Sequence, residues 1–498
     1  MEQDSSIEEF QPLQQHINHF PNEVLDHIFA FLALPDRKSV SLVCHRWNKV
    51  AFAPHYMRKI ELRLISCDPA FDGGRFEALK QTERIYRNIL AFHVHSLISP
   101  DLMKLLFEVL SFLGGNLESF YCLNHVGKRE LRQILQLAPN LKQLIARVQE
   151  DETYTEPMPV MEHLVDFAAL SQVLHKKGLE IESMFPKLSK MSTHFVKCTD
   201  YSRAVEAFQH FGPQLQSLEI SADNNLLPLD QLRFPQLEAI HMSGKMCLSI
   251  DNYTLKSFFG QFNNLSEAFI DCAVQDNILE VITKTCSKLR VLHIAVDSLR
   301  GPGFASLGQL PNLKTLSIGG LLRQDMLKEC PKPITTVLNL DIRIYKQTTS
   351  TEDFFLLQKV LPNIRDIRVH YVDCANPNMT LSKLIRSFPK LKRLEIQVQC
   401  RSQKVQRARA LKALASVEEL IINGIDVAIN DIPESSQLKR LYIFYLNSSN
   451  DDGILRLVRR LPALRFLELG WCRGITEHGV HQIRREFPQC VVHLMANR

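Results

Sequence analysis

The sequence of 498 residues lacks the short motifs that mark common catalytic sites. It has no Gly-x-x-x-x-Gly-Lys loop to hold a nucleotide, no Gly-x-Ser-x-Gly turn to present a serine nucleophile and no His-Glu-x-x-His helix to bind zinc. His478 and His481 are spaced to share a helix face beside Glu477, but no third ligand converges on them, so a surface pair is favoured over a metal site. The sequence therefore predicts a protein without catalytic residues, metal or cofactor of its own.

Long apolar runs are also missing. No stretch reaches the roughly 18 apolar residues that a membrane-spanning helix needs, and even Leu102–Leu113 contains Lys104 and Glu108. The first ten residues are acidic and lack the apolar segment of a secretory signal. The 12 cysteines include no Cys-x-x-Cys pair, which favours buried thiols over disulfides or zinc ligands. We therefore expect a cytoplasmic and/or nuclear protein that does not contact membranes.

The chain has little net charge, with 59 Lys and Arg against 54 Asp and Glu and a formal value of +5. Such a small excess gives no reason to expect nucleic-acid binding. One basic run, from Lys383 to Lys412, holds ten Lys and Arg and a single acid, Glu395. It could meet an acidic or phosphorylated partner or nucleic acid, although the solvated outer face of helices is the favoured interpretation.

The stretch from Phe20 to Ala51 predicts three short helices, the first of which has more apolar surface than so small a unit can bury. Asn22 is placed to cap that helix and Pro35-Asp36 to open the next one. The surplus surface could cap the following domain or bind another chain. The large apolar side chains of this helix, which fall within about 160° of arc, are Phe31, Val24, Ile28, Leu32, Leu25 and Phe29.

A different pattern recurs along most of the remaining chain. An apolar residue at position i is followed by apolar residues at i+3 and i+5, often with proline at i−2. A degraded copy at Ile334, Val337 and Asn339 lies within the long step from Leu313 to Ile364. The clear copies, which are otherwise 21 to 28 residues apart, begin at Leu215, Leu237, Leu265, Leu289, Leu313, Ile364, Leu391, Val417, Leu438 and Leu464.

This period is typical of leucine-rich repeats. Each copy predicts a helix that ends at the proline and then a short strand, on which i+3 and i+5 point into the core. No single copy can bury its apolar face, so the copies must stack into a continuous solenoid.

The N-terminal stretch resembles the F-box, the module that joins substrate receptors to the Skp-type adaptor of Skp–cullin–F-box (SCF) ubiquitin ligases. Two departures are mild: Phe20 replaces the usual leucine, and Arg37-Lys38-Ser39 is polar where many relatives carry a leucine. With the repeats, the whole chain resembles F-box/leucine-rich-repeat proteins. The matching residues are Phe20-Pro21, Glu23-Val24-Leu25, Ile28-Phe29, Leu32, Asp36, Ser41-Leu42-Val43-Cys44 and Arg46-Trp47.

This resemblance implies an α/β fold with three parts. A flexible acidic tail (1–18) precedes a three-helix F-box (19–58), and a right-handed leucine-rich-repeat solenoid, or horseshoe, follows (59–498). The solenoid is expected to be irregular to about 210 and regular afterwards, with a parallel concave sheet and convex helices.

The resemblance also implies a function: a non-catalytic substrate receptor that binds the Skp-type adaptor through its F-box and, through it, the cullin and RING subunits. A protein substrate held by the repeats would then be ubiquitinated and degraded. A scaffold whose F-box only caps the solenoid and a small-molecule-gated receptor remain alternatives. The implied adaptor-binding residues are Phe20, Pro21, Val24, Leu25, Ile28, Phe29, Leu32 and Trp47, the last with a partly structural role.

The repeat pattern places positions i+2, i+4 and i+6 on the concave sheet face. This face is bland in the middle of the chain but carries arginines and aromatic residues toward the C-terminus, and these residue types dominate protein-binding hot spots. We hypothesise that they bind the substrate; the alternative is that the aromatics pack beneath neighbouring loops. The residues are Arg368, His370, Arg393, Arg440, Tyr442, Phe444, Phe466 and Trp471.

Overall fold

Contacts divide the chain into two compact units, residues 1–166 with 183–187 and residues 167–182 with 188–498. Residues 1–16 of the expected tail lie outside the described part. The computed structural model describes residues 17–32, 34–58, 60–65, 87–92, 100–148, 156–169, 181–195, 201–222, 227–244, 251–296, 299–320, 324–345, 351–372, 377–399, 409–414, 416–424, 427–432, 434–435, 437–446 and 449–495.

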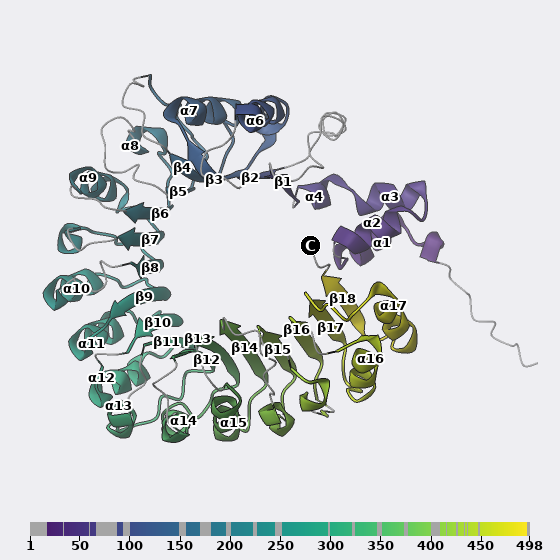
Figure 1. Cartoon of the computed structure of the whole chain (residues 1–498). Helices are drawn as coiled ribbons and strands as arrows, with labels where there is room; N and C mark the ends of the chain where they lie inside the picture. The colour runs from purple at the N-terminus through teal and green to yellow at the C-terminus, as the bar shows by residue number, and fades with distance from the viewer. Residues whose placement is uncertain are drawn as a thin grey trace, which may run out of the picture. The chain divides into compact units, whose positions relative to one another are not determined.

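The first unit begins with short helices packed around a small core (Figure 1). A 3-10 turn, η1 (Ile17–His19), precedes α1 (Asn22–Ala30), α2 (Leu34–Ser41), α3 (His45–Ala51) and α4 (Pro54–Met57). The Trp47 ring meets Phe29 edge-on, with centroids 5.3 Å apart. The three expected helices are present, and the core consists of Leu25, Phe29, Trp47, Val50, Ala51 and Tyr56.

The expected cap at Asn22 was wrong. Pro21 occupies the N-cap position of α1, and no side chain caps this helix. The Asn22 Oδ1 atom instead accepts a hydrogen bond from Arg46 Nε at 2.7 Å. Arg46 also donates to the carbonyl oxygens of Asn18 and Phe20, so its guanidinium joins α3 to the start of α1.

The rest of the first unit already has the alternation of strands and helices. Its parallel strands pair in chain order from β1 to β4. Repeats therefore begin well before the clear sequence pattern. The elements are β1 (Glu61–Ile65), β2 (Asn88–Phe92), α6 (Pro100–Leu113), η2 (Gly114–Asn116), β3 (Ser119–Val126), α7 (Lys128–Leu137) and β4 (Gln143–Val148).

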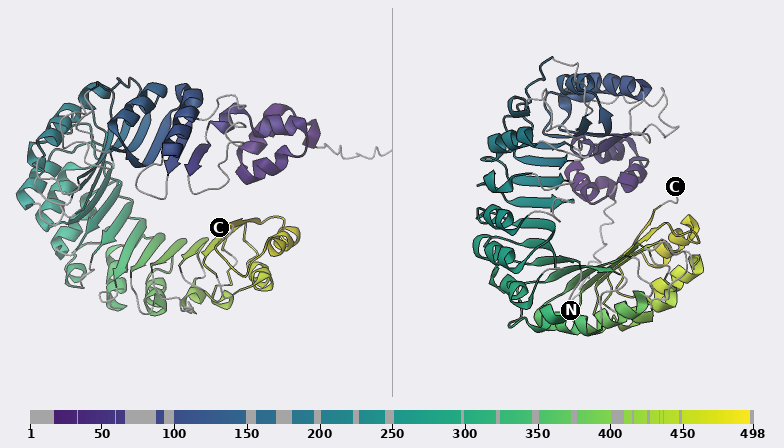
Figure 2. Two further views of the ribbon diagram at one scale, coloured as in Figure 1. Left: turned by 45° about the horizontal axis from the view of Figure 1, so that its top comes forward. Right: turned by 60° about the vertical axis from the view of Figure 1, so that its left-hand side comes forward.

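The second unit continues this alternation, and each strand from β6 to β18 pairs in parallel with the next. Within the unit the strands line the inner, concave side and the helices the outer side (Figures 1 and 2). The elements are β5 (Asp166–Ala169), α8 (Ile181–Met184), β6 (Lys190–Phe195), α9 (Ser202–Phe211), β7 (Ser217–Ala222), η4 (Leu229–Gln231), β8 (Ala239–Ser243), α10 (Asn252–Phe259), β9 (Glu267–Ala273), α11 (Asp276–Thr285), β10 (Val291–Ala295), α12 (Gly301–Ser306), η6 (Leu307–Gln309), β11 (Thr315–Gly319), α13 (Gln324–Lys328), β12 (Asn339–Tyr345), α14 (Thr351–Val360), β13 (Asp366–Val372), α15 (Pro377–Ser387), β14 (Arg393–Gln399), η7 (Arg409–Ala413), β15 (Glu419–Asn423), η8 (Ile429–Asp431), β16 (Arg440–Phe444), α16 (Asp451–Arg459), β17 (Phe466–Gly470), α17 (Glu477–Glu486) and β18 (Val491–Met495).

The repeat anchors form the core of this unit. In every clear copy the residues at i, i+3 and i+5 are buried, as the sequence predicts. The expected fold class, helical F-box followed by strand–helix repeats with a parallel sheet, is confirmed. Among the described residues, no helix has the length and apolar character needed to cross a membrane.

The supposedly degraded copy is a complete repeat in a different phase. Leu340 pairs with Leu316 and Ile342 with Ile318, so the anchor at position i is Val337 and not Ile334. Both Ile334 and Val337 are buried, which explains why apolarity alone did not separate them. Many other repeats have a proline at position i−2, which marks the anchor, but this repeat has Thr335 there.

A line of phenylalanines links successive repeats inside the second unit. The ring of Phe208 lies 6.2 Å from Phe195 and 6.1 Å from Phe234, and Phe258 lies 6.1 Å from Phe234. Phe258 also meets Phe262 at 4.9 Å and 89°. These edge-to-face contacts add to the burial of each ring, so the line joins neighbouring repeats into one core.

We expect Phe258→Ala to lower the free energy of unfolding by about 3–5 kcal/mol, because it leaves a cavity where the repeats meet. Urea unfolding followed by circular dichroism measures the effect. Phe355→Ala is the matched control, since Phe355 is half exposed on α14 and its loss should change the midpoint little. Equal shifts in both variants would contradict the role of the phenylalanine line.

Candidate functional site

Three of the expected adaptor-binding residues are turned into the F-box. Leu25, Phe29 and Trp47 are buried in its core. Phe20, Ile28 and Leu32 are partly buried against the same core. The physical reason is size: helices this short must use most of their apolar residues to hold one another. These residues therefore shape the F-box, and their direct contact with an adaptor stays a prediction.

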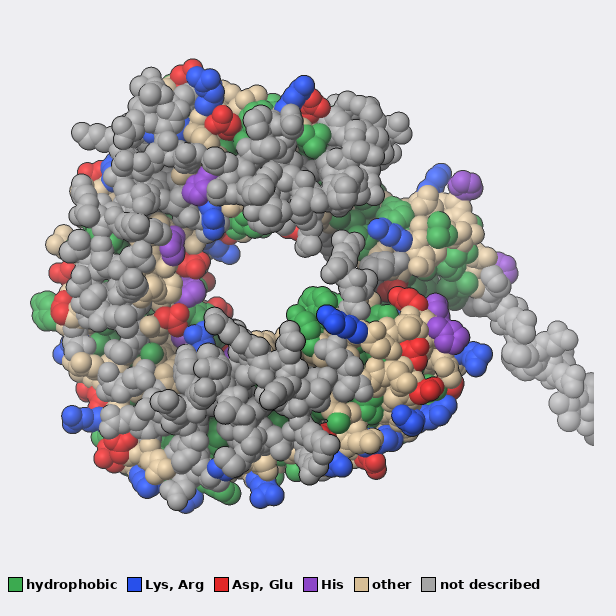
Figure 3. Space-filling model, in the orientation of Figure 1, with side chains coloured by type: hydrophobic (Ala, Val, Ile, Leu, Met, Phe, Trp, Pro, Cys, Tyr) green, Lys and Arg blue, Asp and Glu red, His purple; other side chains and the backbone are tan. Residues whose placement is uncertain are grey.

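Other apolar side chains cover the outside of the F-box (Figure 3). Leu42 is 86% exposed and Phe31 is 79% exposed, and Val24 and Val43 are exposed as well. Val24 belonged to the expected contact set, and Leu42 entered through the F-box resemblance. Val43 was expected from its spacing to pack inward on the third helix, but it lies between α2 and α3 and is exposed. Four exposed apolar residues on so small a module are suited to contact with a protein partner.

The second candidate surface is the concave sheet face of the second unit. From β7 to β18, one residue of each strand stands beside the equivalent residue of the next strand. We name this series the central row, and its members are about 4.8 Å apart because that is the spacing of paired strands. The central row consists of Glu219, His241, Phe269, His293, Ser317, Asp341, Arg368, Glu395, Ile421, Tyr442, Glu468 and His493.

The middle of this surface contains a buried histidine with two partners. The His293 Nδ1 atom lies 2.6 Å from Ser317 Oγ, and its Nε2 atom lies 2.7 Å from Asp271 Oδ1. The hydrogen bond from His293 lowers the pKa of the Asp271 carboxyl below its ordinary value. Hydrolases use the same three residue types, but Ser317 is buried and cannot meet a substrate. These side chains instead tie β9, β10 and β11 together.

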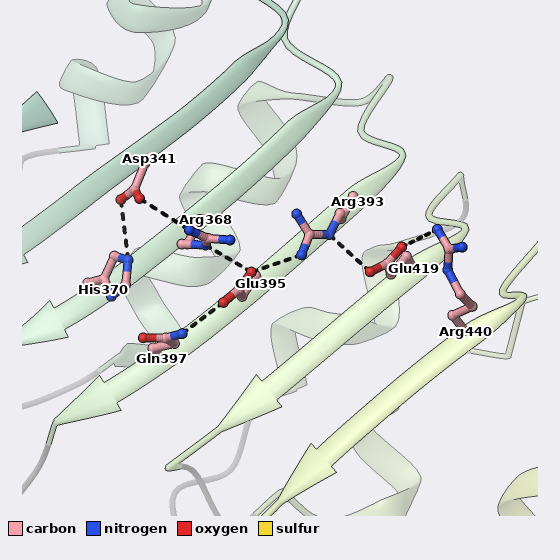
Figure 4. Close-up of polar contacts among 8 residues, drawn as sticks. All are labelled: Asp341, Arg368, His370, Arg393, Glu395, Gln397, Glu419 and Arg440. Carbon is pink, nitrogen blue, oxygen red and sulfur yellow. Dashed lines mark hydrogen bonds and ion pairs between the residues drawn. The ribbon is translucent and has the colours of Figure 1, made fainter. Parts of the chain in front are cut away.

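The next strands carry a continuous network of charges, drawn in Figure 4. Arg368 Nε lies 2.9 Å from Glu395 Oε2, and Arg393 Nη2 lies 3.1 Å from the same oxygen. Gln397 Nε2 donates to the other oxygen of Glu395 at 2.8 Å. Glu395 is thus a buried carboxylate whose two oxygens are both satisfied, as a buried charge requires.

The network continues in both directions. His370 Nε2 lies 3.3 Å from Asp341 Oδ1, and Arg393 Nε lies 3.0 Å from Glu419 Oε1. Arg440 pairs with the second oxygen of Glu419. We name this set the charged ladder; its arginines are matched by carboxylates, and it comprises Asp341, Arg368, His370, Arg393, Glu395, Gln397, Glu419 and Arg440.

Toward the C-terminal strands, the concave face carries several aromatic side chains. Tyr442 lies 5.2 Å from Phe466, measured between ring centroids, and Phe466 lies 5.1 Å from His493. Phe444 lies 5.9 Å from Trp471, and Tyr445 stacks on Trp471 at 5.1 Å with an interplanar angle of 13°. We name these rings the aromatic end. Tyr445 and Trp471 are 44% and 41% exposed, so their stack is accessible to solvent.

The backbone at this stack is strained. Tyr445 and Trp471 have φ values of 70° and 51°, a left-handed conformation that bulky residues rarely adopt. Each directly follows its strand, the position at which Gly244, Gly320 and Gly424 adopt the same conformation in other repeats. The fold thus holds two exposed aromatic residues where glycine fits without strain, at a cost of about 1–3 kcal/mol each.

Comparison with known proteins bears on both surfaces. Residues 17–63 match the family model described as F-box-like. Over 315 residues the chain is 24% identical to F-box/LRR-repeat protein 12 of Homo sapiens and 23% identical to the Bos taurus protein of that name. Each alignment covers 63% of this chain and 81% of the relative. Residues 17–63 are thus F-box-like, and the chain is similar to F-box/leucine-rich-repeat proteins.

Two solved structures resemble it distantly. The chain in the TLR13–ssRNA13 complex is 13% identical with a TM-score of 0.43; the match covers 84% of this chain but only 59% of that one. The structure of the Rad7 and Elc1 complex in yeast gives 13% identity and a TM-score of 0.28, covering 95% of this chain and 92% of that chain.

The eight expected substrate-binding residues all lie on or directly beside the concave face. Four belong to the charged ladder and four to the aromatic end, and the two groups meet where Arg440 stands opposite Phe466. Arg368, Arg393 and Arg440 are less available than the sequence suggested, because each already pairs with a carboxylate. The aromatic residues remain the stronger candidates for binding.

Two features escaped the sequence analysis. Tyr445 was missed although it replaces, with Trp471, the glycine that follows other strands. The His293 cluster was missed because the concave positions of the repeats at Leu265 and Leu289 were not followed individually; they contain Asp271 and His293. In the repeat numbering these residues occupy three different positions: His293 is at i+4, Asp271 at i+6 and Tyr445 at i+7.

The His293–Asp271 contact predicts a pH effect on stability. Because the folded-state pKa of Asp271 is lowered, its stabilisation is present above the ordinary carboxyl pKa of about 3.9 and is lost as pH falls through the lower folded value. Asp271→Asn should therefore reduce the urea midpoint at neutral pH, and the difference from wild type should shrink in acid. Asp452→Asn, at an exposed site, is the control. A difference that stays constant with pH would contradict this role of the ionised carboxylate.

Proposed function

We propose that the chain is the substrate-binding subunit of an SCF ubiquitin ligase. The observation that carries the proposal is the exposed apolar surface of the F-box, formed by Val24, Phe31, Leu42 and Val43, within the segment that matches the F-box-like model. F-boxes bind Skp-type adaptors, and this surface supplies apolar contacts of the kind that protein partners cover. The relatives named F-box/LRR-repeat protein 12 support the same assignment.

In this proposal the chain contributes proximity and no bond-making group. The Skp-type adaptor joins the F-box to the cullin, and the cullin joins it to the RING subunit with its charged ubiquitin-conjugating enzyme. A substrate held by the repeats then has a lysine at high effective concentration near the thioester, which accelerates transfer without a catalytic side chain on this chain. The ubiquitinated substrate goes to the proteasome, and we place this activity in the cytoplasm, the nucleus or both.

We further propose that the aromatic end binds the protein substrate. Its rings are large and only partly buried, and residues of this type contribute most to binding hot spots. Backbone strain at Tyr445 and Trp471 supports the proposal, because strained conformations gather at sites of function. The stack also limits the motion of both rings, so little conformational entropy is lost when a partner covers them.

Adaptor binding is tested by Phe31→Asp combined with Leu42→Asp. We expect the double variant to lose the Skp-type adaptor and cullin in affinity purification with mass spectrometry, since each change places a charge in an apolar interface. Both side chains are exposed, so the circular dichroism spectrum should not change. Tyr253→Asp, at an exposed aromatic residue of α10, is the matched control and should retain both partners. If the double variant retains them too, the ligase proposal fails and the scaffold interpretation takes its place.

Substrate binding is tested with Tyr442→Ala combined with Trp471→Ala. The F-box double variant serves as the background, because it should retain substrates that it cannot pass to the ligase. Loss of two hot-spot rings should weaken capture by tenfold or more, at about 1.4 kcal/mol per factor of ten. Tyr253→Ala controls for loss of an exposed ring. Unchanged recovery of the retained proteins would exclude the aromatic end as the substrate surface.

A further inference from the structure

A second series of residues runs along the edge at which the strands begin. It consists of position i+1, the residue after each repeat anchor, and we name it the rim row. The backbone N–H of Lys314 donates to the Arg290 carbonyl at 2.9 Å, and that of Lys392 donates to the Arg365 carbonyl at 2.7 Å. The same bond joins every consecutive pair from Ser189 to Val491. Neighbouring members are therefore held one strand spacing apart, at about 4.8 Å.

The charge of the rim row changes abruptly along the unit. Its first members, Ser189, Gln216, Glu238 and Ser266, include no cation. The following eight include six cations and one acid, and all six cations are exposed. These eight residues are Arg290, Lys314, Leu338, Arg365, Lys392, Glu418, Lys439 and Arg465.

Only part of this charge is balanced. Glu418 lies 2.9 Å from Lys392 Nζ and 2.8 Å from Lys439 Nζ, and these two partners lower the pKa of its carboxyl to about 2. Within the described part of the chain, no ion pair joins Arg290, Lys314 or Arg365 to a carboxylate, although Arg365 interacts electrostatically with the adjacent Asp366. These three cations precede the basic run from Lys383 to Lys412, of which residues 400–408 lie outside the described part. The interpretation of that run as a solvated face stays a prediction.

The rim row differs from the charged ladder in how its cations are paired. On the concave face each arginine of the ladder has a carboxylate partner from the same or a neighbouring strand. On the rim, Arg290 and Lys314 stand directly beside one another with no acid between them. Like charges opposite one another destabilise paired strands. The cations of the charged ladder are paired within the fold, whereas Arg290, Lys314 and Arg365 of the rim row are not. The rim row can therefore bind an anion from outside the chain.

We propose that Arg290, Lys314 and Arg365 bind a carboxylate-rich segment of a partner protein. These cations extend over the start of β10 to β13, about 14 Å, which matches four or five residues of an extended peptide. A polypeptide occupant fits better than a nucleic acid, because sites for single-stranded nucleic acids usually combine cations with aromatic side chains on which bases stack. The neighbouring i+2 residues are Val291, Thr315, Asn339 and Asp366, none of which is aromatic.

The test uses the full chain and a fluorescein-labelled octaglutamate peptide, with binding followed by anisotropy at low and moderate salt. The rim variant Arg290→Gln/Lys314→Gln/Arg365→Gln is compared with Lys256→Gln/Arg456→Gln/Arg485→Gln, which removes the same charge from exposed positions of the outer helices α10, α16 and α17. We expect about a tenfold or greater loss of affinity in the rim variant and less than about a twofold loss in the control. All six side chains are exposed, so both variants should keep the wild-type circular dichroism spectrum.

Three outcomes would overturn the proposal: no binding of the peptide by wild type, equal losses in both variants, or tighter binding of an oligouridine of the same length. The F-box double variant Phe31→Asp/Leu42→Asp is measured alongside and should bind the peptide like wild type. Failure of the ligase proposal would thus leave this result unaffected, and failure of the rim proposal would leave adaptor binding unaffected.

Discussion

Backbone hydrogen bonding between consecutive parallel strands is the constraint on which the rest of the second unit depends. It holds equivalent positions of the repeats side by side, so a residue chosen in one repeat immediately acquires fixed neighbours in the repeats before and after it. The core, the central row and the rim row are three consequences of the same register. Each can carry a different chemistry, because their side chains point in different directions from one backbone.

The F-box is subject to a different constraint: its core is too small to bury all of its apolar side chains. Its helices are short, and the apolar face of α1 is wider than the small core beneath it can cover. Phe29 and Trp47 complete the interior, and apolar residues that remain, such as Phe31 and Leu42, have nowhere inside to go. Interior and contact surface therefore come from adjacent positions of the same helix, which is why a motif match alone does not divide them.

The sequence predicted much of the architecture because the buried positions of each repeat are apolar and recur at a regular spacing. The anchors of every clear repeat proved buried, but at Ile334 two apolar residues three apart fitted the pattern equally well and only strand register decided between them. Charge pairing was harder to predict. Arg393 looks like a free cation in the sequence, yet its partner Glu419 lies 26 residues away and becomes a neighbour only when β14 and β15 align. Strain at Tyr445 was invisible for the same reason, since φ depends on the turn that the next repeat imposes.

The left-handed aromatic residues have a consequence for how this protein can change. Glycine at position 471 would relieve backbone strain of about 1–3 kcal/mol, but it would give up a stacking contact of about 0.5–1.5 kcal/mol and the burial of more than half of the indole. A tryptophan codon becomes a glycine codon by a single nucleotide change, so this substitution is always within reach of mutation. The relief of strain offsets part of the stability that glycine would lose. Selection for thermal stability therefore opposes the change less than burial alone would, whereas selection for binding would keep Trp471 in place.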